Sequence, residues 1–334
     1  MLLPDRVFAF VLRTHRWDPN HRSVIQSLMA THFAKKKSER RQFDLIQDKG
    51  KGLVILLHGV PGVGKTSTAE TVAQYYNKPL LPITCGDLGM TPKDVESNLQ
   101  NSFQMAQAWD CVLLLDEADV FLAERSQDNI ERNALVSVFL RVLEYYEGVL
   151  FLTTNKVGSF DEAFKSRMSM ALYYPPLSGT QTEKIWGMQI KRTEKLTIKA
   201  APNDESVHVK FDQLDIMKFA ADLWNEQQFK PEFKPVWNGR QIRNAFQTAV
   251  ALAEWQKQDG NIPGPINVKR EHFEKVARVS MEFNSYLYGV KHSRGDEMLN
   301  LKKEQRYDAF NPNQVSPFGF DYAAIYFEEG RNKG

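Results

Sequence analysis

The chain has 334 residues, of which 42% are hydrophobic and 25% are charged, so it is long enough for two domains with a substantial core. Its formal net charge of +2 gives no indication of broad nucleic-acid binding. No apolar run approaches the length of a membrane span. The two cysteines, Cys85 and Cys111, lie in or beside apolar stretches, which indicates buried thiols in a reducing intracellular compartment without distinguishing cytoplasm from nucleus.

The first 50 residues contain two predicted elements. An apolar run at 7–12, rich in aromatic and β-branched residues, predicts a strand and marks residues 1–19 as a linker or the remnant of an upstream domain. Apolar residues recur at helical spacing over 20–34, which predicts an amphipathic helix. The basic tract at 35–41 is diluted by acidic residues, which favours a solvated helix end over a nucleic-acid or membrane-surface patch.

A strand, a glycine loop and a helix follow one another between residues 53 and 76. The apolar run 53–57 predicts a buried strand, residues 59–66 match G-x-x-x-x-G-K-[ST], and 67–76 is compatible with a helix. This order is the one that a phosphate-binding loop requires. A glycine turn that precedes a lysine by chance would not explain the strand and helix on either side.

The residue types in this loop suit a phosphate chain. Gly62 and Gly64 let the backbone turn so that successive N–H groups point at phosphate oxygens, and the helix N-terminus adds partial positive charge. Lys65 is expected to reach the β- and γ-phosphates, and the Thr66 hydroxyl to ligate magnesium.

A second motif follows a predicted strand at 80–84 and a predicted helix at 91–108. Residues 111–115 form an apolar strand that ends in Asp116 and Glu117, at the sheet edge where ligands collect in open α/β sheets. We expect Asp116 to hold magnesium through water, and Glu117 to polarise the water that attacks the γ-phosphate. The alternative is that the two acids cap the next helix.

Two further polar residues follow buried elements. After a predicted helix at 133–146 and a strand at 149–153, Asn155 is expected between the attacking water and the γ-phosphate, although an asparagine here can also simply begin a turn. Arg167 ends a predicted helix. It either compensates the helix dipole or projects into a neighbouring subunit as an arginine finger.

The remaining chain is predicted to be mainly helical. A strand at 170–174 leads to Pro175-Pro176, which marks a hinge. The pattern Thr180-x-x-Glu183 predicts a capping box at the start of a helix. Further predictions are that helix to about 192, polar irregular residues at 195–211 with a short hairpin at 207–209, helices at 212–228, 239–258 and 270–290, and a loose tail from about 306.

Over about residues 20–290 the chain resembles the AAA+ ATPase family, and in particular filamentous-fungal AAA proteins with an ATPase core and a helical lid. The stretches that carry the resemblance are GVPGVGKT at 59–66, VLLLDEAD at 112–119, TTN at 153–155, FDEAFKSR at 160–167 and NGRQIRNA at 238–245. The resemblance implies an α/β P-loop fold, with a parallel sheet flanked by helices and followed by a small all-helical lid. The implied division is a core at 20–176, a lid at 177–291 and a C-terminal extension at 292–334.

The resemblance also implies roles for particular residues. Glu117, Asn155 and Arg167 would be catalytic, as the Walker B glutamate, sensor 1 and the arginine finger, while Thr66 and Asp116 would hold the metal. Arg240 lies where sensor 2 residues occur, with Arg243 as a weaker candidate. The implied nucleotide-binding set is Gly59, Pro61, Gly62, Val63, Gly64, Lys65, Thr66, Ser67, Asp116 and Arg240.

The implied activity is hydrolysis of ATP with Mg²⁺ by a homo-oligomeric ring, a hexamer by resemblance, that remodels an unidentified protein or complex. A nucleotide-dependent switch or scaffold with little turnover is the alternative, but a pure binder needs none of Glu117, Asn155 and Arg167. Residues 116–119 also spell the DEAD-box helicase signature. That class needs a second RecA-like α/β domain, and the chain beyond residue 176 has hardly any strand pattern.

Two stretches depart from the family pattern. Many ring translocases carry an aromatic residue on the pore loop after the second strand, whereas residues 85–92 contain none, so Leu88 or Met90 would offer only a softer contact. Threading of a polypeptide is therefore not predicted. The stretch 16–20 is shorter than the segment that usually closes over adenine, which predicts weaker nucleotide binding.

Overall fold

The computed structural model describes residues 19–37, 52–89, 91–125, 130–229, 235–291, 296–303, 305–308 and 310. The predicted strand at 7–12, the side chains of the basic tract at 35–41, most of the stretch 16–20 and Met90 lie outside the described residues. Within the described part, no helix is both long enough and apolar enough to cross a membrane.

The centre of the α/β part is a five-stranded sheet in the order β2-β3-β4-β1-β5, in which every neighbouring pair is parallel. The predicted parallel α/β fold is therefore confirmed. The central strands are continuous apolar runs because both of their faces are covered. The strands are β1 (Leu53–Gly59), β2 (Leu80–Thr84), β3 (Val112–Asp116), β4 (Val149–Thr154) and β5 (Met170–Tyr174).

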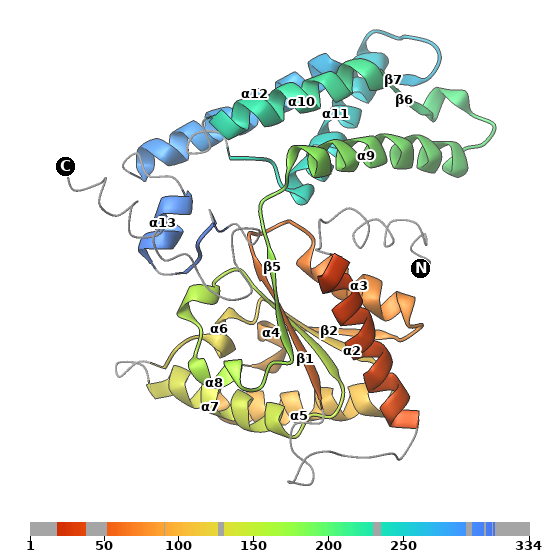
Figure 1. Ribbon diagram of the computed structural model, residues 1–334. Coiled ribbons are helices and arrows are strands. Elements are labelled where there is room, and N and C mark those ends of the chain that lie inside the picture. The colour runs from red at the N-terminus through yellow and green to blue at the C-terminus, as the bar shows by residue number, and fades with distance from the viewer. Residues whose placement is uncertain are drawn as a thin grey trace.

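The sheet lies between two layers of helices (Figure 1), and successive residues of β1 belong to different buried clusters on its two faces. Ile55 and Leu57 belong to a buried cluster with α2 (Pro19–Lys37) and α3 (Lys65–Tyr75). Val54 and Leu56 belong to a second cluster with α5 (Pro92–Ala108) and α7 (Ile130–Glu144). Shorter elements complete the second layer: α4 (Cys85–Leu88), α6 (Asp119–Leu122), η1 (Val157–Ser159) and α8 (Glu162–Lys165).

The predicted amphipathic helix at 20–34 corresponds to α2, whose Ile25 and Met29 are buried in the first of these clusters. The helix predicted at 91–108 corresponds to α5, in which the Thr91 hydroxyl caps the N-terminus by accepting a hydrogen bond from the Asp94 N–H and Pro92 occupies the first turn.

Beyond β5, four long helices form a helical lid above the sheet (Figure 1). They pack around Trp186, whose ring centroid lies 5.0 Å from that of Phe273 and 5.1 Å from that of Phe246. The helices are α9 (Gly179–Ala200), α10 (Gln213–Phe229), α11 (Gly239–Asp259) and α12 (Arg270–Val290).

Three local predictions for the lid were wrong. The capping box that opens α9 is formed by Ser178 and Gln181, two residues earlier than the predicted pair, because the chain becomes helical at Gly179. The helix also continues to Ala200 instead of ending near 192. In place of a hairpin at 207–209, a 3-10 turn, η2 (Glu205–Val207), leads to β6 (Val209–Phe211), which pairs in parallel with β7 (Ile266–Val268). The lid is therefore helical with one small two-stranded sheet added.

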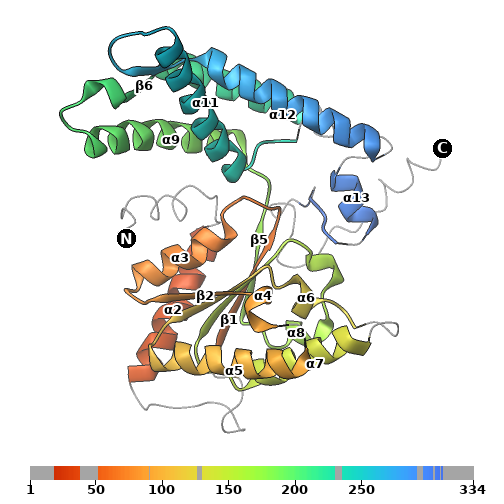
Figure 2. The same cartoon turned by 180° about the vertical axis from the view of Figure 1, so that it is seen from behind.

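The chain beyond α12 returns to the α/β part, so the prediction of a loose tail from residue 306 is wrong for the residues that the structure describes. Helix α13 (Asp296–Lys302) lies between the end of α12 and the α/β part in both views (Figures 1 and 2). Gln305 C=O then accepts a hydrogen bond of 2.8 Å from Gly158 N–H, and the Phe310 ring packs edge-on against Tyr173 at 5.3 Å.

One partly buried histidine on the central sheet is expected to make the fold sensitive to acid. His58 on β1 lies against the Tyr173 ring, its Nδ1 has no hydrogen-bond partner among the described residues, and burial together with Lys65 lowers its pKa to about 4. Because the unfolded chain takes up a proton near pH 6.5 and the folded chain does not, the free energy of unfolding falls as pH drops from 6.5 towards 4.

Between pH 7 and pH 5 we expect this residue to cost about 2 kcal/mol of stability. Urea unfolding at the two pH values measures the loss. His58→Gln should remove most of it, and His208→Gln, in which a partly exposed lid histidine is replaced, should not. An equal pH dependence in wild type and His58→Gln would contradict the assignment.

Candidate active site

A tight glycine loop joins β1 to α3 at the edge of the sheet where the strands end. Gly62 and Gly64 have φ angles of +73° and +102°, which L side chains rarely adopt, so both positions need glycine. Gly59 also has a positive φ, of +130°, and is needed for a second reason, since a Cβ atom there would lie 2.2 Å from the carbonyl oxygen of Tyr174. The loop therefore depends on its glycines both for its conformation and for its packing on β5.

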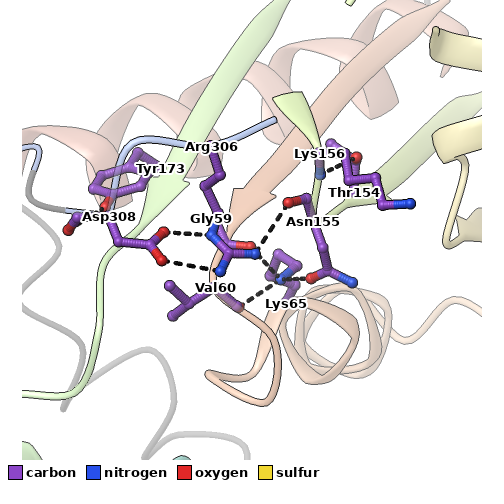
Figure 3. A network of polar contacts seen from close by, with 9 residues as sticks. All are labelled: Gly59, Val60, Lys65, Thr154, Asn155, Lys156, Tyr173, Arg306 and Asp308. Carbon is purple, nitrogen blue, oxygen red and sulfur yellow. Dashed lines mark hydrogen bonds and ion pairs between the residues drawn. The ribbon is translucent and has the colours of Figure 1, made fainter. Parts of the chain in front are cut away.

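The Lys65 side chain is folded back into the loop and is only 7% exposed. Its Nζ donates hydrogen bonds to Gly59 O at 3.0 Å, Val60 O at 2.7 Å and Asn155 Oδ1 at 2.7 Å (Figure 3). Burial lowers its pKa to about 8, and the nearby Arg306 acts in the same direction while the neighbouring carboxylates oppose it. The ammonium group is thus a cation at neutral pH, held against neutral acceptors.

Asp116, at the end of β3, accepts hydrogen bonds from two threonines. The Thr66 hydroxyl lies 3.1 and 3.2 Å from the two carboxylate oxygens, and the Thr153 hydroxyl donates to Oδ1. A hydroxyl and a carboxylate side by side are the hard oxygen ligands that Mg²⁺ prefers. Thr66 and Asp116 therefore fit a magnesium ion.

Glu117 has a left-handed backbone with φ of +55°, a conformation that non-glycine residues rarely adopt and that is often found at functional sites. Its N–H donates to the Thr153 hydroxyl at 3.0 Å, and its C=O accepts from the Cys85 thiol at 3.0 Å. Burial raises the pKa of Cys85 to about 11, so the thiol keeps its proton and remains a donor. Two side chains therefore hold the turn that carries this carboxylate.

Asn155 follows β4 and is held at three points. Its Oδ1 accepts from Lys65, its N–H donates to Asp119 Oδ1 at 3.3 Å, and its C=O accepts from Arg306 at 3.2 Å. Asp119 also accepts a hydrogen bond from the Thr154 hydroxyl. The amide side chain is thereby fixed beside Lys65.

A cavity of about 450 Å³ lies between the ends of the strands and the lid, and residues from the glycine loop, β3 and β4 line one side of it. Helix α9 contributes the apolar Ile185 and Met188, and α11 contributes the exposed Arg240 and Arg243. The predicted residues that line the cavity are Pro61, Gly62, Val63, Gly64, Lys65, Thr66, Ser67, Asp116, Glu117, Asn155 and Arg240. Gly59 and Arg167 do not line it.

The lid touches the glycine loop directly. Gly239 N–H donates to Gly62 O at 2.9 Å, and the Asn238 side chain lies so close that a Cβ atom on Gly62 would be 2.4 Å from its Cγ. Asn238 is also the N-cap of α11. The loop and the third long helix of the lid are therefore in contact on one side of the cavity.

Two family models match the chain in succession. Residues 55–176 match "ATPase family associated with various cellular activities (AAA)", and residues 177–294 match "Fungal AAA+ ATPase lid domain". The chain belongs to the AAA+ ATPase family. The AAA+ resemblance drawn from the sequence motifs, including its fungal character, is confirmed.

Curated relatives of this AAA+ chain are distant. Cell division control protein 48 homolog B of Arabidopsis thaliana is 33% identical over 36% of this chain and 22% of its own length. ATPase family AAA domain-containing protein 3-A of Xenopus laevis is 30% identical over 70% of this chain and 40% of its own length. ATPase family AAA domain-containing protein 3B of Homo sapiens is 29% identical over 38% and 21%. The chain thus spans less than half of each of these relatives.

In this AAA+ chain Arg167 lies near the N-terminal ends of the strands, whereas the glycine loop follows the C-terminal end of β1. Arg167 precedes β5, whose Met170 pairs with Ile55 near the start of β1, so a strand of about 17 Å separates it from the cavity. Its Nη1 donates to Ala163 O at 2.9 Å, and its Nη2 lies 3.7 Å from a carboxylate oxygen of Glu144. Arg167 therefore does not reach the cavity of its own chain.

Two of the residues considered in the sequence analysis differ from expectation in their burial. Leu88 is 1% exposed in the core, so it is not available as a contact for a polypeptide. Of the two cysteines, Cys111 is buried as predicted and Cys85 is only partly buried.

The alternative interpretation as a DEAD-box helicase required a second RecA-like α/β domain. The described residues beyond 176 contain only β6 and β7 as strands, which excludes a second RecA-like sheet in that part of the chain.

Several residues at the site were not predicted from the sequence. They are the lid residues Ile185 and Met188, which line the cavity, and four residues that hold the motif residues in place: Cys85, Thr153, Asp119 and Arg306. Thr153 and Asp119 adjoin motif residues, so their position was a usable indication. The other two reach the site from α4 and from beyond the lid, and nothing local in the sequence marks them.

Proposed function

We propose that this AAA+ chain binds Mg²⁺-ATP in the cavity beside the glycine loop and hydrolyses it. The observation that carries the proposal is the convergence of Lys65, Thr66, Asp116, Glu117 and Asn155 at one wall of that cavity. A cation, a pair of metal-binding oxygens, a carboxylate and an amide are the groups that phosphoryl transfer to water requires.

The glycine loop and the N-terminus of α3 would bind the phosphates. Lys65 would exchange its bonds with Gly59 and Val60 for phosphate oxygens, because a charged acceptor is the stronger partner. Arg240 or Arg243, one helical turn apart on α11, would bind the phosphate chain from the lid side. The apolar surface of Ile185 and Met188 on α9 suits a planar base.

Thr66 and Asp116 would hold the magnesium ion, which supplies positive charge to neutralise the phosphate oxygens as the bond breaks. Glu117 would accept the proton of the attacking water or orient that water. Asn155 would position the water relative to the terminal phosphate. The hydrogen bond that the Glu117 N–H donates to Thr153 and the one that its carbonyl accepts from Cys85 would keep its carboxylate directed into the site.

Arg167 would complete the site of a neighbouring copy in a homo-oligomeric ring, a hexamer by family resemblance. Its position at the N-terminal ends of the strands, away from the cavity of its own chain, supports this role. So does its Nε atom, which is buried without a hydrogen-bond partner among the described residues. In this account residues 20–176 act as the core and 177–291 as the lid. The lid would rotate about Pro175-Pro176 and remodel an unidentified protein or complex.

The nucleotide-binding part of the proposal is tested with Lys65→Ala, and with Lys93→Ala on the exposed face of α5 as the matched control. Loss of a charge-assisted hydrogen bond costs about 2–3 kcal/mol, so Lys65→Ala should weaken Mg²⁺-ATP binding by about 30- to 160-fold. Isothermal titration calorimetry measures the dissociation constants. Equal affinity in the two variants would refute the assignment of this cavity as the ATP site.

A further inference from the structure

The segment 305–308 with residue 310, which we call the C-terminal strap, lies along the loop that carries Asn155 (Figure 3). The strap reaches this loop from beyond the lid. The two backbone contacts that it makes are therefore contacts between the end of the described chain and the centre of the candidate active site.

The first contact is made by Arg306, whose Nη1 donates to the Asn155 carbonyl oxygen at 3.2 Å. The remaining donors of the same guanidinium bind both carboxylate oxygens of Asp308, with Nη2 at 2.9 Å from Oδ2. Each of these side chains is only 11% exposed. Because Asp308 already fixes the Arg306 side chain, the hydrogen bond from Arg306 to the Asn155 carbonyl costs little further side-chain entropy.

The second contact fixes the other end of the loop. Gly158 N–H donates to the Gln305 carbonyl oxygen at 2.8 Å, three residues after Asn155. The strap itself is anchored on β5, where the Tyr173 hydroxyl donates to the Asp308 carbonyl at 3.4 Å and the Phe310 ring packs on Tyr173. The loop between Asn155 and Gly158 is thus clamped at both ends by one segment.

We infer that Arg306 is a positioning residue for Asn155: by holding its backbone carbonyl, Arg306 fixes where the Asn155 amide stands relative to Lys65 and the terminal phosphate. The inference rests on the proposed ATP hydrolysis. A displacement of about 1 Å in a positioning group can lower a rate by up to ~100-fold. Loss of this single backbone hydrogen bond is therefore enough to lower the rate of hydrolysis through a displacement of Asn155.

Arg306 does not act as a second arginine finger. It does not line the cavity, and its guanidinium is held by two hydrogen bonds to the carboxylate of Asp308 and one to the Asn155 carbonyl oxygen. Its effect therefore passes through Asn155, and this distinguishes the inference from a direct role in binding phosphate.

The test compares Arg306→Ala and Arg306→Lys with Arg278→Ala, which removes an exposed arginine from α12. We expect Arg306→Ala to lower kcat about 10-fold with the dissociation constant of Mg²⁺-ATP changed less than about 2-fold, Arg306→Lys to recover part of the loss, and Arg278→Ala to match wild type. In an Asn155→Ala background, Arg306→Ala should cause no further loss. Unchanged kcat in Arg306→Ala, or a full additional loss in that background, would overturn the inference.

Hydrogen exchange supplies a readout that does not depend on turnover. In nucleotide-free protein, amides in the peptide covering 155–160 should exchange faster in Arg306→Ala than in wild type or Arg278→Ala. Unchanged exchange would overturn the inference even if wild type hydrolyses ATP. A wild type that lacks turnover would instead refute the proposed function, and the exchange result would still decide whether the strap holds the Asn155 loop.

Discussion

Arg167→Ala is expected to lower ATP turnover by at least ~1000-fold while the affinity for Mg²⁺-ATP changes less than about 2-fold. The reason is the location of Arg167: it lies a strand length away from the cavity of its own chain, and we propose that it acts on the site of a neighbouring copy. Steady-state phosphate release and a parallel ATP titration measure the two quantities. Arg141→Ala is the control, because Arg141 also lies on the surface of the α/β part and also forms an ion pair, with Glu96 at 2.7 Å.

A mixing experiment separates action on a neighbour from a folding defect. Lys65→Ala chains bind ATP only weakly and lack the lysine at the phosphates but carry an intact Arg167, and Arg167→Ala chains bind ATP but lack the arginine. Mixed together, the two inactive variants should recover a measurable part of wild-type turnover. Absence of any recovery, when size-exclusion chromatography shows mixed oligomers, would contradict the role of Arg167 in trans.

Glu117→Gln is expected to lower turnover by at least ~100-fold and to leave ATP bound but unhydrolysed. Glutamine keeps the shape of the side chain. The hydrogen bonds that hold this turn, one donated to Thr153 and one accepted from Cys85, involve the backbone of residue 117 and so survive the change. What is lost is the ability to accept a proton from water.

Single-turnover hydrolysis of radiolabelled ATP distinguishes slow chemistry from slow product release in this variant. Glu162→Gln on α8 is the control, since that carboxylate is 91% exposed and remote from the cavity. Wild-type turnover in Glu117→Gln would remove Glu117 from the mechanism.

The α/β sheet and the glycine loop could be predicted because their determinants are local. Continuous apolar runs such as 53–57 indicate strands that are buried on both faces, and the glycine spacing at 59–66 indicates a loop whose conformation only glycine adopts. The end of each strand then delivers Asp116, Glu117 and Asn155 to the same edge of a parallel sheet. Most of the candidate site therefore follows from the glycine-loop motif and from the parallel direction of the strands.

The supporting contacts could not be predicted, because they join segments that are far apart in sequence. The Cys85 thiol reaches the Glu117 backbone from α4, and Arg306 reaches Asn155 from beyond the lid. The tail around Arg306 contains Pro, Gly and Asn throughout, a composition typical of loose termini. The buried pair of Arg306 and Asp308 has no hydrophobic periodicity that would reveal it.

The two-stranded sheet of the lid was missed for a related reason. β6 and β7 are three residues each and pair across two intervening helices, α10 and α11. Val209 and Ile266 are buried by the pairing, but a run of three residues carries too little alternation to indicate a strand.

The specific rate of ATP hydrolysis, measured in saturating Mg²⁺-ATP against the concentration of the chain, tests the central claim most directly. An active site completed by Arg167 of a neighbouring copy predicts a rate per chain that rises with concentration and then reaches a plateau, with Lys65→Ala at background throughout. A constant, substantial rate down to the lowest concentrations, where the chain is monomeric, would contradict the account.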